Sequence, residues 1–197
     1  MYIYLIRHGQ TQGNKEKRYI GRTDDALTDE SRSFLKKAHF PKVDRVYCSP
    51  LLRCRQTAEL IYPEQAAIIV KDFRECDFGI FDNKNHAELN GNKDYQKWLA
   101  GEIAPPQGES NEAFQERCVK AFSQVVEQAL QANLTAIALI VHGGTIMSIM
   151  QHYAKPQQDF YAWQVANGEG WQVEIEEELW HSEQCFTKIE KLEAIVQ

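Results

Sequence analysis

Two short apolar runs, each ending in His-Gly, place the strongest constraint on the fold of this chain. Leu5–Thr11 reads LIRHGQT and Leu139–Thr145 reads LIVHGGT, with Leu, Ile, His, Gly and Thr at the same places. Their separation is far longer than the unit of a solenoid repeat. Each run is typical of a buried strand. Because ligands bind at the carboxyl ends of parallel strands, we predict two neighbouring strands that each deliver a histidine to one site.

Predicted strands alternate with predicted helices along most of the chain. Apolar runs rich in strand-forming residues cover residues 2–6, 43–48, 66–70 and 135–141. Helical patterns follow between them, including a long helix over residues 111–132 capped by Ser110, and a helix that opens at Gly143-Gly144 and ends before Pro156. The alternation predicts an α/β fold, a three-layer α/β/α sandwich with a mostly parallel central sheet.

The first predicted helix follows Thr28, which is suited to cap it. Phe34, Leu35 and Ala38 share one face of this helix and are expected to point inward. Pro41 is expected to stop it.

The stretch SPLLR, Ser49 to Arg53, predicts a helix start directly after a strand. Ser49 is expected as the N-cap and Pro50 as the first helical residue, with the helix running to about residue 62. A helix N-terminus presents free N–H groups and the positive end of the helix dipole. Arg53 falls in the first turn and could join an anion site, although on this motif alone a surface arginine is the simpler interpretation.

Two regions depart from the strand–helix alternation. Residues 80–108 hold short helical patches and are interpreted as a helical, cap-like excursion over the sheet, within one domain spanning residues 1–197. Asn85, His86, Lys93 and Trp98 in this region are candidates to face a ligand, or equally a solvated helical face. The tail alternates around an Asn167-Gly168 turn signal, which indicates antiparallel strands that close the sheet.

Composition narrows the class of ligand. The formal net charge is −6, which argues against nonspecific nucleic-acid binding, and no apolar run is long enough to span a membrane. The apolar run after Met1 is too short for a signal peptide, so a cytoplasmic location is expected. The five cysteines are widely spaced without a CxxC pair and are expected to be reduced thiols. Arginines near the start suit a small anionic ligand.

Four chemical groups follow predicted strands or lie in apolar surroundings. Arg7 and His8 end the first strand, where an arginine fork suits phosphate or carboxylate oxygens. Glu75 lies among apolar and aromatic residues that can raise a carboxyl pKa and prepare a general acid. His142 ends another strand before a glycine-rich helix start. Each residue alone also has an ordinary structural explanation.

Taken together and in order, these segments resemble the histidine phosphatase superfamily, which includes cofactor-dependent phosphoglycerate mutase. The resemblance runs from Tyr2 to about Met150 and implies a phosphoglycerate mutase-like fold. It rests on R-H-G-x-T-x-x-N (Arg7 to Asn14), Tyr19-Ile-Gly21, Leu27-Thr28, S-P-L-x-R followed by Gln56-Thr57-Ala58, E-x-x-F-G (Glu75 to Gly79), Gly108-Glu-Ser110, and V-x-H-G-G from Val141.

The resemblance implies a phosphohistidine mechanism. His8 matches the nucleophile, Arg7, Arg53 and His142 match the phosphate pocket, and Glu75 matches the general acid. Neither a cofactor nor a metal is expected. A rival site of two histidines and a carboxylate around a metal would place two fixed arginine cations beside a divalent ion. Matched or adjacent positions expected to contact substrate are Gly9, Gln10, Thr11, Asn14, Ile20, Gly21, Gly143 and Gly144.

The expected function is a phosphomonoesterase acting on a small phosphorylated metabolite, since the short chain resembles the phosphatase branch. α-Ribazole 5'-phosphate is one candidate substrate. The alternatives are a phosphoglycerate mutase and a non-catalytic binding module; an exposed sheet edge would permit a homodimer. The chain departs from the family pattern at Phe81-Asp82-Asn83, where many relatives have a W-E-G-like stretch, and at Ser31, where a glycine is common.

Overall fold

A six-stranded mixed sheet forms the centre of the computed structural model, which describes residues 1–196. Its strand order is β4-β3-β5-β1-β6-β7. The first four strands are mutually parallel, β6 is antiparallel to β1, and β7 is antiparallel to β6. The strands of this sheet are β1 (Tyr2–Arg7), β3 (Arg45–Cys48), β4 (Ile68–Ile69), β5 (Ala136–Val141), β6 (Gly170–Glu174) and β7 (Lys188–Leu192). A small second sheet pairs β2 (Ala38–His39) with β8 (Ile195–Val196).

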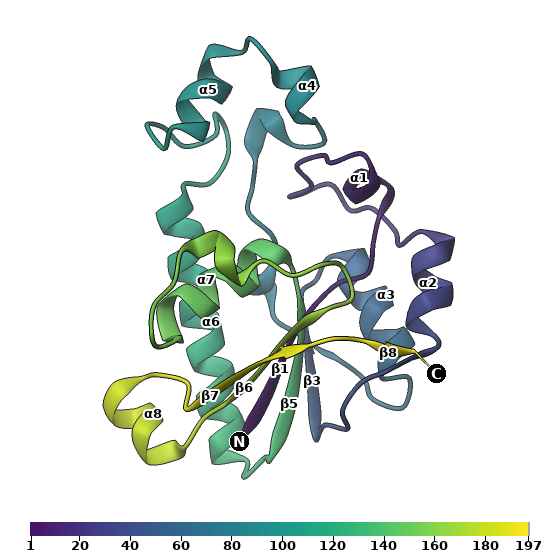
Figure 1. Cartoon of the computed structure of the whole chain (residues 1–197), viewed down its shortest axis with the longest axis vertical. Coiled ribbons are helices and arrows are strands. Elements are labelled where there is room, and N and C mark those ends of the chain that lie inside the picture. Colours follow the sequence, from purple (N-terminus) through teal and green to yellow (C-terminus); the bar gives the residue numbers. More distant parts are fainter. Residues whose placement is uncertain (197) are drawn as a thin grey trace.

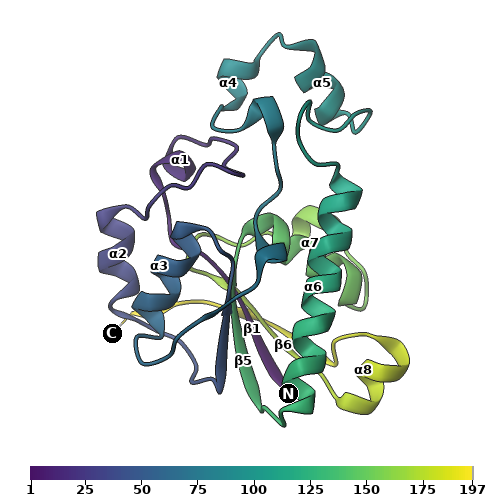
Figure 2. The same cartoon turned by 180° about the vertical axis from the view of Figure 1, so that it is seen from behind.

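Helices cover both faces of the central sheet, which gives the predicted three layers (Figures 1 and 2). One face carries α6 (Asn111–Gln131), α7 (Gly143–Tyr153) and α8 (Glu177–Glu183). The other carries α3 (Leu52–Ile61), against which α2 (Asp29–Leu35) packs. The fold class expected from the sequence, an α/β sandwich with a mostly parallel sheet, is confirmed.

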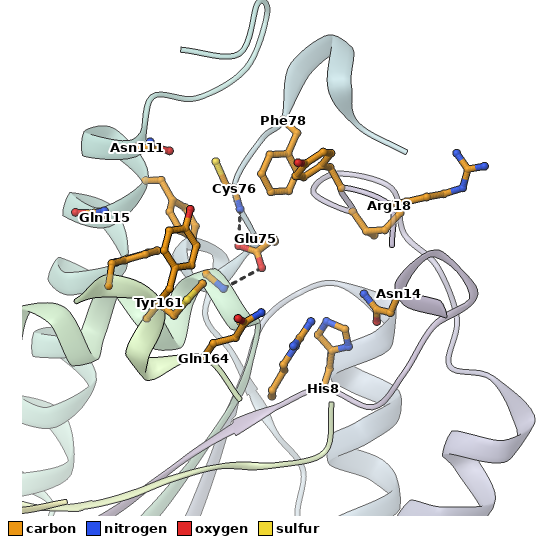
Figure 3. Close-up of a pocket in the computed structure, with 18 of the residues that line it drawn as sticks. His8, Asn14, Arg18, Glu75, Cys76, Phe78, Asn111, Gln115, Tyr161 and Gln164 are labelled. Carbon is orange, nitrogen blue, oxygen red and sulfur yellow. Dashed lines mark hydrogen bonds between the residues drawn. The ribbon is translucent and has the colours of Figure 1, made fainter. Parts of the chain in front are cut away.

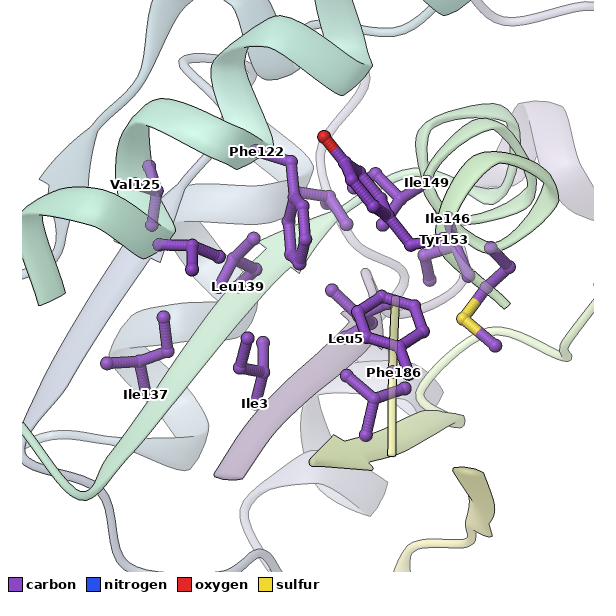
Figure 4. Packing of buried hydrophobic residues seen from close by; sticks show 14 of the residues in the cluster. Ile3, Leu5, Phe122, Val125, Ile137, Leu139, Ile146, Ile149, Tyr153 and Phe186 are labelled. Atoms are coloured by element: carbon purple, nitrogen blue, oxygen red, sulfur yellow. The ribbon is translucent and has the colours of Figure 1, made fainter. Parts of the chain in front are cut away.

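Strand β1 shows why the sheet needs helices on both faces. Alternate side chains of a strand point to opposite faces. Ile3 and Leu5 therefore pack in the cluster that contains Phe122 of α6 (Figure 4). Tyr4 and Ile6 pack in the cluster on the α3 side. Full burial of each aliphatic side chain stabilises the fold by about 1.5–3 kcal/mol.

The two His-Gly runs lie side by side in register. Strands β1 and β5 are parallel neighbours, and Leu5 pairs with Leu139, Ile6 with Ile140 and Arg7 with Val141. The His8 amide then donates to the Val141 carbonyl across 3.0 Å. The prediction of two neighbouring strands delivering His8 and His142 to one edge is confirmed, and the shared pattern reflects a shared position in the sheet.

Two predicted helix boundaries were wrong. Thr28 caps α2 as expected, but the helix ends at Leu35, so Ala38 lies in β2 and Phe34 is 41% exposed. Helix α3 has its N-cap at Leu51, not Ser49. The free amide of Leu52 donates to Asp24 Oδ1 across 2.6 Å, so a carboxylate from a distant loop replaces the local cap.

The tail closes the sheet with antiparallel strands, as predicted. Strand β6 pairs with β1 on one side and with β7 on the other. The Asn167-Gly168 turn lies just before β6, and the connection from β6 to β7 passes through α8. The Gly168 amide donates to the Arg7 and His8 carbonyls, so the turn is held against the end of β1.

Short helices of residues 79–99 lie beyond the carboxyl edge of the sheet (Figure 1). They are the 3₁₀ turn η2 (Gly79–Phe81), α4 (His86–Leu89) and α5 (Lys93–Leu99). Phe81, Leu89 and Tyr95 form their own buried cluster, against which Tyr19 and Trp98 pack. The remaining short elements are α1 (Gln12–Lys15) and the 3₁₀ turns η1 (Lys71–Phe73) and η3 (Phe160–Trp163). Within residues 1–196, no helix combines the length and apolar character needed to cross a bilayer.

Candidate active site

A cavity of about 540 Å³ opens where β1 and β5 end (Figure 3). Arg7, His8, Glu75, Gly143 and Gly144 are among the residues that line it. They come from the end of β1, from the segment after η1 and from the start of α7. The topology therefore brings groups that are far apart in sequence to the edge where α/β sheets bind ligands.

His8 is buried and its tautomer is fixed. The ring is 3% exposed, and Nδ1 donates to the Gly9 carbonyl across 2.7 Å. Arg53 Nε donates to His8 Nε2 across 3.3 Å, so Nε2 carries a lone pair. Burial, followed by the charges of Arg53 and Arg7, lowers the pKa of His8 well below its ordinary value. The ring is therefore neutral, the state that a histidine nucleophile requires.

Arg53 is a buried cation held by backbone carbonyls. It is 1% exposed and lies in the first turn of α3. One terminal nitrogen donates to Thr23 O across 2.8 Å, and the other donates to the Ile20 and Gly21 carbonyls, each across 3.2 Å. These bonds fix the guanidinium beside His8, where it can attract phosphate oxygens.

Arg7 supplies the second cation. One terminal nitrogen donates to the Val165 carbonyl across 2.7 Å, which anchors the guanidinium to the segment before β6. Its Nε atom is buried without a hydrogen-bond partner among residues 1–196. A buried donor without a partner is costly, and an anionic oxygen in the cavity would satisfy it.

His142 lies next to His8, with 5.2 Å between ring centroids. Its Nε2 is hydrogen-bonded to Ser49 Oγ at 2.7 Å, a partner that sequence reasoning missed because Ser49 was interpreted as a helix cap. Burial, then the charge of Arg53, lowers the pKa of His142 well below its ordinary value. The ring is therefore neutral and can donate through only one nitrogen.

Glu75 lines the same cavity as His8. Its carboxylate accepts from the Cys76 amide at 2.9 Å and from the Gly144 amide at 3.3 Å (Figure 3). Burial raises the pKa of Glu75 even though these amides, together with the charges of Arg53 and Arg7, favour the carboxylate. A raised pKa suits a group that must hold and release a proton near neutral pH.

Arg117 braces the backbone that presents Glu75. It donates to the Glu75 carbonyl across 3.0 Å and to both oxygens of Glu109 across 2.7 Å. Both side chains of this ion pair are at most 15% exposed. Sequence reasoning missed Arg117 because its helical position resembles that of any arginine on the polar face of α6.

The predicted substrate-contact positions divide into two groups. Asn14, Ile20, Gly143 and Gly144 line the cavity. Within the described residues, its lining does not include Gly9, Gln10, Thr11 or Gly21. These four shape the surrounding loops: the Gly9 amide donates to Thr57 Oγ1, the Gln10 amide donates to Ser31 Oγ, Thr11 caps α1, and the Gly21 carbonyl accepts from Arg53.

The outer half of the cavity is aromatic and amide-rich. Trp98 lines it, whereas Asn85, His86 and Lys93 lie outside its lining within residues 1–196. Arg18 also lines it but points away from the centre (Figure 3) and is ion-paired with Glu16 and Glu88. The other outer residues include Tyr19, Phe78, Asn111, Phe114, Gln115, Phe160, Tyr161 and Gln164.

Across residues 1–196, no three His, Cys, Asp or Glu side chains come together in a way that could hold a metal ion. The groups that converge at His8 are instead two arginines, a second histidine and one carboxylate. Such a set is suited to an anionic phosphate group.

Comparison with known proteins agrees with this geometry. The chain is 33% identical over 162 residues to the "Putative phosphoserine phosphatase 2" of Hydrogenobacter thermophilus, covering 75% of this chain and 76% of that protein. It is 25% identical over 179 residues to the adenosylcobalamin/alpha-ribazole phosphatase of Escherichia coli, covering 85% and 87% of the two chains.

A solved structure shares the fold of this chain, and a family model matches most of its length. The alpha-ribazole phosphatase from Shigella flexneri superimposes with a TM-score of 0.79 at 22% identity, covering all of this chain and 96% of that one, which shows a common fold. The model of the histidine phosphatase superfamily (branch 1) matches residues 3–187. With the ordered motifs, the fold and the convergence of His8 with two arginines all in agreement, the chain belongs to branch 1 of the histidine phosphatase superfamily.

Proposed function

We propose that this protein is a phosphomonoesterase that hydrolyses a small phosphorylated metabolite through a phosphohistidine on His8. The observation that carries the proposal is the pair of contacts made by the two ring nitrogens of His8. Its Nδ1 proton is committed to the Gly9 carbonyl, and its Nε2 lone pair faces the Arg53 cation. Once the Arg53 hydrogen bond passes from Nε2 to a phosphate oxygen, the lone pair of the neutral ring can attack a phosphate monoester.

In the first half-reaction, His8 Nε2 forms a bond to phosphorus as the bond from phosphorus to the ester oxygen breaks. The phosphoryl group carries charge on its three equatorial oxygens in the transition state. Arg7 and Arg53 are positioned to stabilise that charge, because Arg53 contacts His8 and because Arg7, whose Nε has no hydrogen-bond partner among residues 1–196, lines the same cavity as His8. His142 contributes as a neutral donor.

Glu75 is proposed to give its proton to the departing ester oxygen. Its raised pKa keeps a larger share of the carboxyl protonated before the reaction. In the second half-reaction the carboxylate accepts a proton from water as the water oxygen bonds to phosphorus and the bond from phosphorus to His8 breaks. Inorganic phosphate leaves, and Glu75 and His8 return to their starting states.

The outer cavity favours a leaving group with a planar ring and hydrogen-bonding groups. Trp98, Phe78 and Tyr161 offer ring faces and edges, while Asn111 and Gln115 offer amides. α-Ribazole 5'-phosphate, a nucleotide with an aromatic base, fits this chemistry, and alpha-ribazole phosphatases are among the similar proteins. We therefore propose it as the first substrate to test.

The mutase alternative finds less support in the outer cavity. A phosphoglycerate carries a carboxylate that needs a cation. Arg18 is the cation of the outer half among the described residues, and Glu16 and Glu88 already neutralise it. A neutral leaving group is the better match to these charges.

The test combines a substrate panel with trapping of the phosphoenzyme. α-Ribazole 5'-phosphate, phosphoserine, 3-phosphoglycerate and p-nitrophenyl phosphate would be assayed for release of inorganic phosphate. We expect phosphate release with a preference for the aromatic ester, and an acid-labile phosphoenzyme that His8→Ala abolishes and His39→Ala, on exposed β2, retains. Interconversion of phosphoglycerates with little phosphate release would instead support a mutase, and turnover by His8→Ala would remove His8 as the nucleophile.

A further inference from the structure

Asp82 gathers four donors from one loop. Its Oδ1 accepts from the Gly21 amide at 2.6 Å and from the Arg22 amide at 3.1 Å. Its Oδ2 accepts from the Thr23 amide at 3.0 Å and from the Thr23 hydroxyl. Three consecutive backbone N–H groups are thus tied to one carboxylate, in a loop that has no regular secondary structure.

The same loop holds Arg53. The carbonyls of Ile20, Gly21 and Thr23 accept from the two terminal nitrogens of the guanidinium. The loop thus directs its N–H groups to Asp82 and its carbonyls to the cation beside His8. A shift of the loop would move the acceptors that aim Arg53.

Close packing at Gly21 shows how tightly the loop and Asp82 fit together. A Cβ at position 21 would overlap the Cys76 carbonyl and would approach Asp82 Oδ1 and Phe78 Cδ2 to 3.0 Å each. A glycine allows the backbone to approach this closely. The loop is also tied to α3 at its other end, because Asp24 accepts from the Leu52 amide.

We propose that Asp82 is a positioning residue for phosphoryl transfer: it fixes residues 20–23, whose carbonyls in turn aim Arg53 at His8 and the substrate phosphate. Asp82 lies outside the cavity lining within residues 1–196, so its influence runs through Arg53. The inference rests on the proposed phosphatase function. It assigns a role to the position where this chain departs from the W-E-G-like stretch.

Asp44 provides a matched control. Its carboxylate also accepts from consecutive amides, Thr135 at 2.6 Å and Ala136 at 3.0 Å, and from the Thr135 hydroxyl at 2.9 Å. This cluster lies at the start of β5, at the opposite edge of the sheet from the cavity. Asp44→Asn should therefore disturb local hydrogen bonding in the same manner without reaching Arg53.

A double-mutant cycle separates positioning from general destabilisation. Asp82→Asn should lower kcat/KM by about 10- to 100-fold, since displacing a catalytic group by about 1 Å costs about that much. In an Arg53→Ala background, Asp82→Asn should lower kcat/KM by about twofold or less, because the residue through which Asp82 acts is gone. Asp44→Asn should leave kcat/KM within about twofold in either background.

Equal losses from Asp82→Asn in the wild-type and Arg53→Ala backgrounds would overturn the proposal, as would a wild-type rate in Asp82→Asn itself. Thr23→Val offers a milder variant because it removes one of the four donors to Asp82 and keeps the side-chain volume. We expect a smaller loss that again disappears in the Arg53→Ala background. An identical loss in both backgrounds would contradict the mechanism even if Asp82→Asn does not fold.

An NMR titration of the His8 ring tests the effect of Asp82 on Arg53 without any enzymatic assay. The charge of Arg53 lowers the pKa of His8, so displacing Arg53 in Asp82→Asn should raise it. If the charge of the Asp82 carboxylate acted directly on His8, its loss would lower the pKa of His8 instead. A lowered or unchanged pKa would therefore refute the proposal that Asp82 acts through Arg53. Absence of phosphatase activity in the wild type would refute only the proposed function. Other charged or titratable groups bordering His8 are Arg7, Glu75 and His142.

Discussion

Arg53 Nε donates a hydrogen bond to His8 Nε2 across 3.3 Å, so a permanent cation contacts the unprotonated nitrogen of a buried imidazole. The contact disfavours protonation at that nitrogen and prepares it to act as a nucleophile. It also places a fixed positive charge where a transferring phosphoryl group would meet the ring. In the proposed mechanism, this one contact would serve both the nucleophile and the stabilisation of the transition state.

Arg53→Lys should reduce kcat by about 10²- to 10³-fold, comparable to loss of one preorganised donor. The guanidinium donates in three directions at once, to His8 and to loop carbonyls such as Thr23 and Gly21. An ammonium group cannot reproduce this planar fork, although it keeps the charge. Steady-state kinetics on p-nitrophenyl phosphate would measure the effect, and Arg55→Lys, on the exposed side of α3, should change little. Wild-type kcat in Arg53→Lys would show that charge alone suffices.

Stability should fall as the pH drops below about 6.5, the ordinary pKa of histidine. Burial lowers the folded-state pKa of both His8 and His142. Below 6.5 the unfolded chain therefore binds protons that the folded chain does not, and each histidine removes about 1.4 kcal/mol of unfolding free energy per pH unit. The loss ends once the pH passes below the folded-state pKa.

Urea denaturation from about pH 8 to about pH 5 would measure this slope. His142→Asn should make the slope shallower, because one depressed group is gone. His39→Asn, on exposed β2, is the control and should leave it unchanged. A His142→Asn protein with the full wild-type slope would contradict the assignment of the pH dependence to the buried rings.

Glu75→Gln should separate substrates by the basicity of their leaving groups. An alkyl phosphate needs a proton on its departing oxygen, so its kcat/KM should fall by about 10²- to 10⁴-fold. p-Nitrophenyl phosphate releases a stable phenolate, so the rate of its burst of phosphoenzyme formation should fall much less. Rapid-quench measurements on both esters would test this prediction. Equal losses for the two would show that Glu75 does not protonate the leaving group.

Gly144→Ala should impair activity more than stability. A Cβ at this position would overlap Glu75 Oε1 and approach the Phe114 ring to 3.0 Å, so the carboxylate must move. We expect kcat to fall by about tenfold or more, since misplacing a catalytic group is costly. Gly91→Ala is the control, because a Cβ there would meet no atom within 4 Å but would sit on a residue with a φ of +85°, so it should lower stability and leave kcat unchanged. The kcat and the melting temperature would be measured for both variants. Similar losses of kcat in the two would refute the role of Gly144.

Chelating agents should leave phosphatase activity intact. Arg7 and Arg53 are fixed cations beside His8 and would repel a divalent ion bound at the same histidines. Activity would be measured before and after dialysis against EDTA. A complete loss that a metal salt restores would revive the site of two histidines and a carboxylate.

Several features of the site were predictable because they depend on local pattern. The apolar runs before His8 and His142 define buried strands, and parallel neighbours end at one edge. The helix start before Arg53 and the apolar surroundings of Glu75 suggested their roles, and the family resemblance assigned them. Glu75 lines the same cavity as His8, whereas Arg53 contacts His8 from outside that lining among residues 1–196.

Local pattern failed where a distant residue supplied the partner. Ser49 carried a cap signal, but its hydroxyl is hydrogen-bonded to His142 while Asp24 caps α3 from another loop. Ala38 fitted a helical face, but the chain leaves the helix at Leu35 and pairs as β2. Propensity is a weak prior that such tertiary contacts override.

The sequence by itself determined the alternation of strands and helices and the two His-Gly strand ends, because periodicity and turn chemistry act over a few residues. Only the tertiary structure decided what surrounds those histidines. The register that sets Arg7 beside Val141, the carbonyls that hold Arg53, and the carboxylate of Asp82 that holds their loop all join residues far apart in the chain. Such contacts depend on three-dimensional distance, which local sequence pattern does not encode.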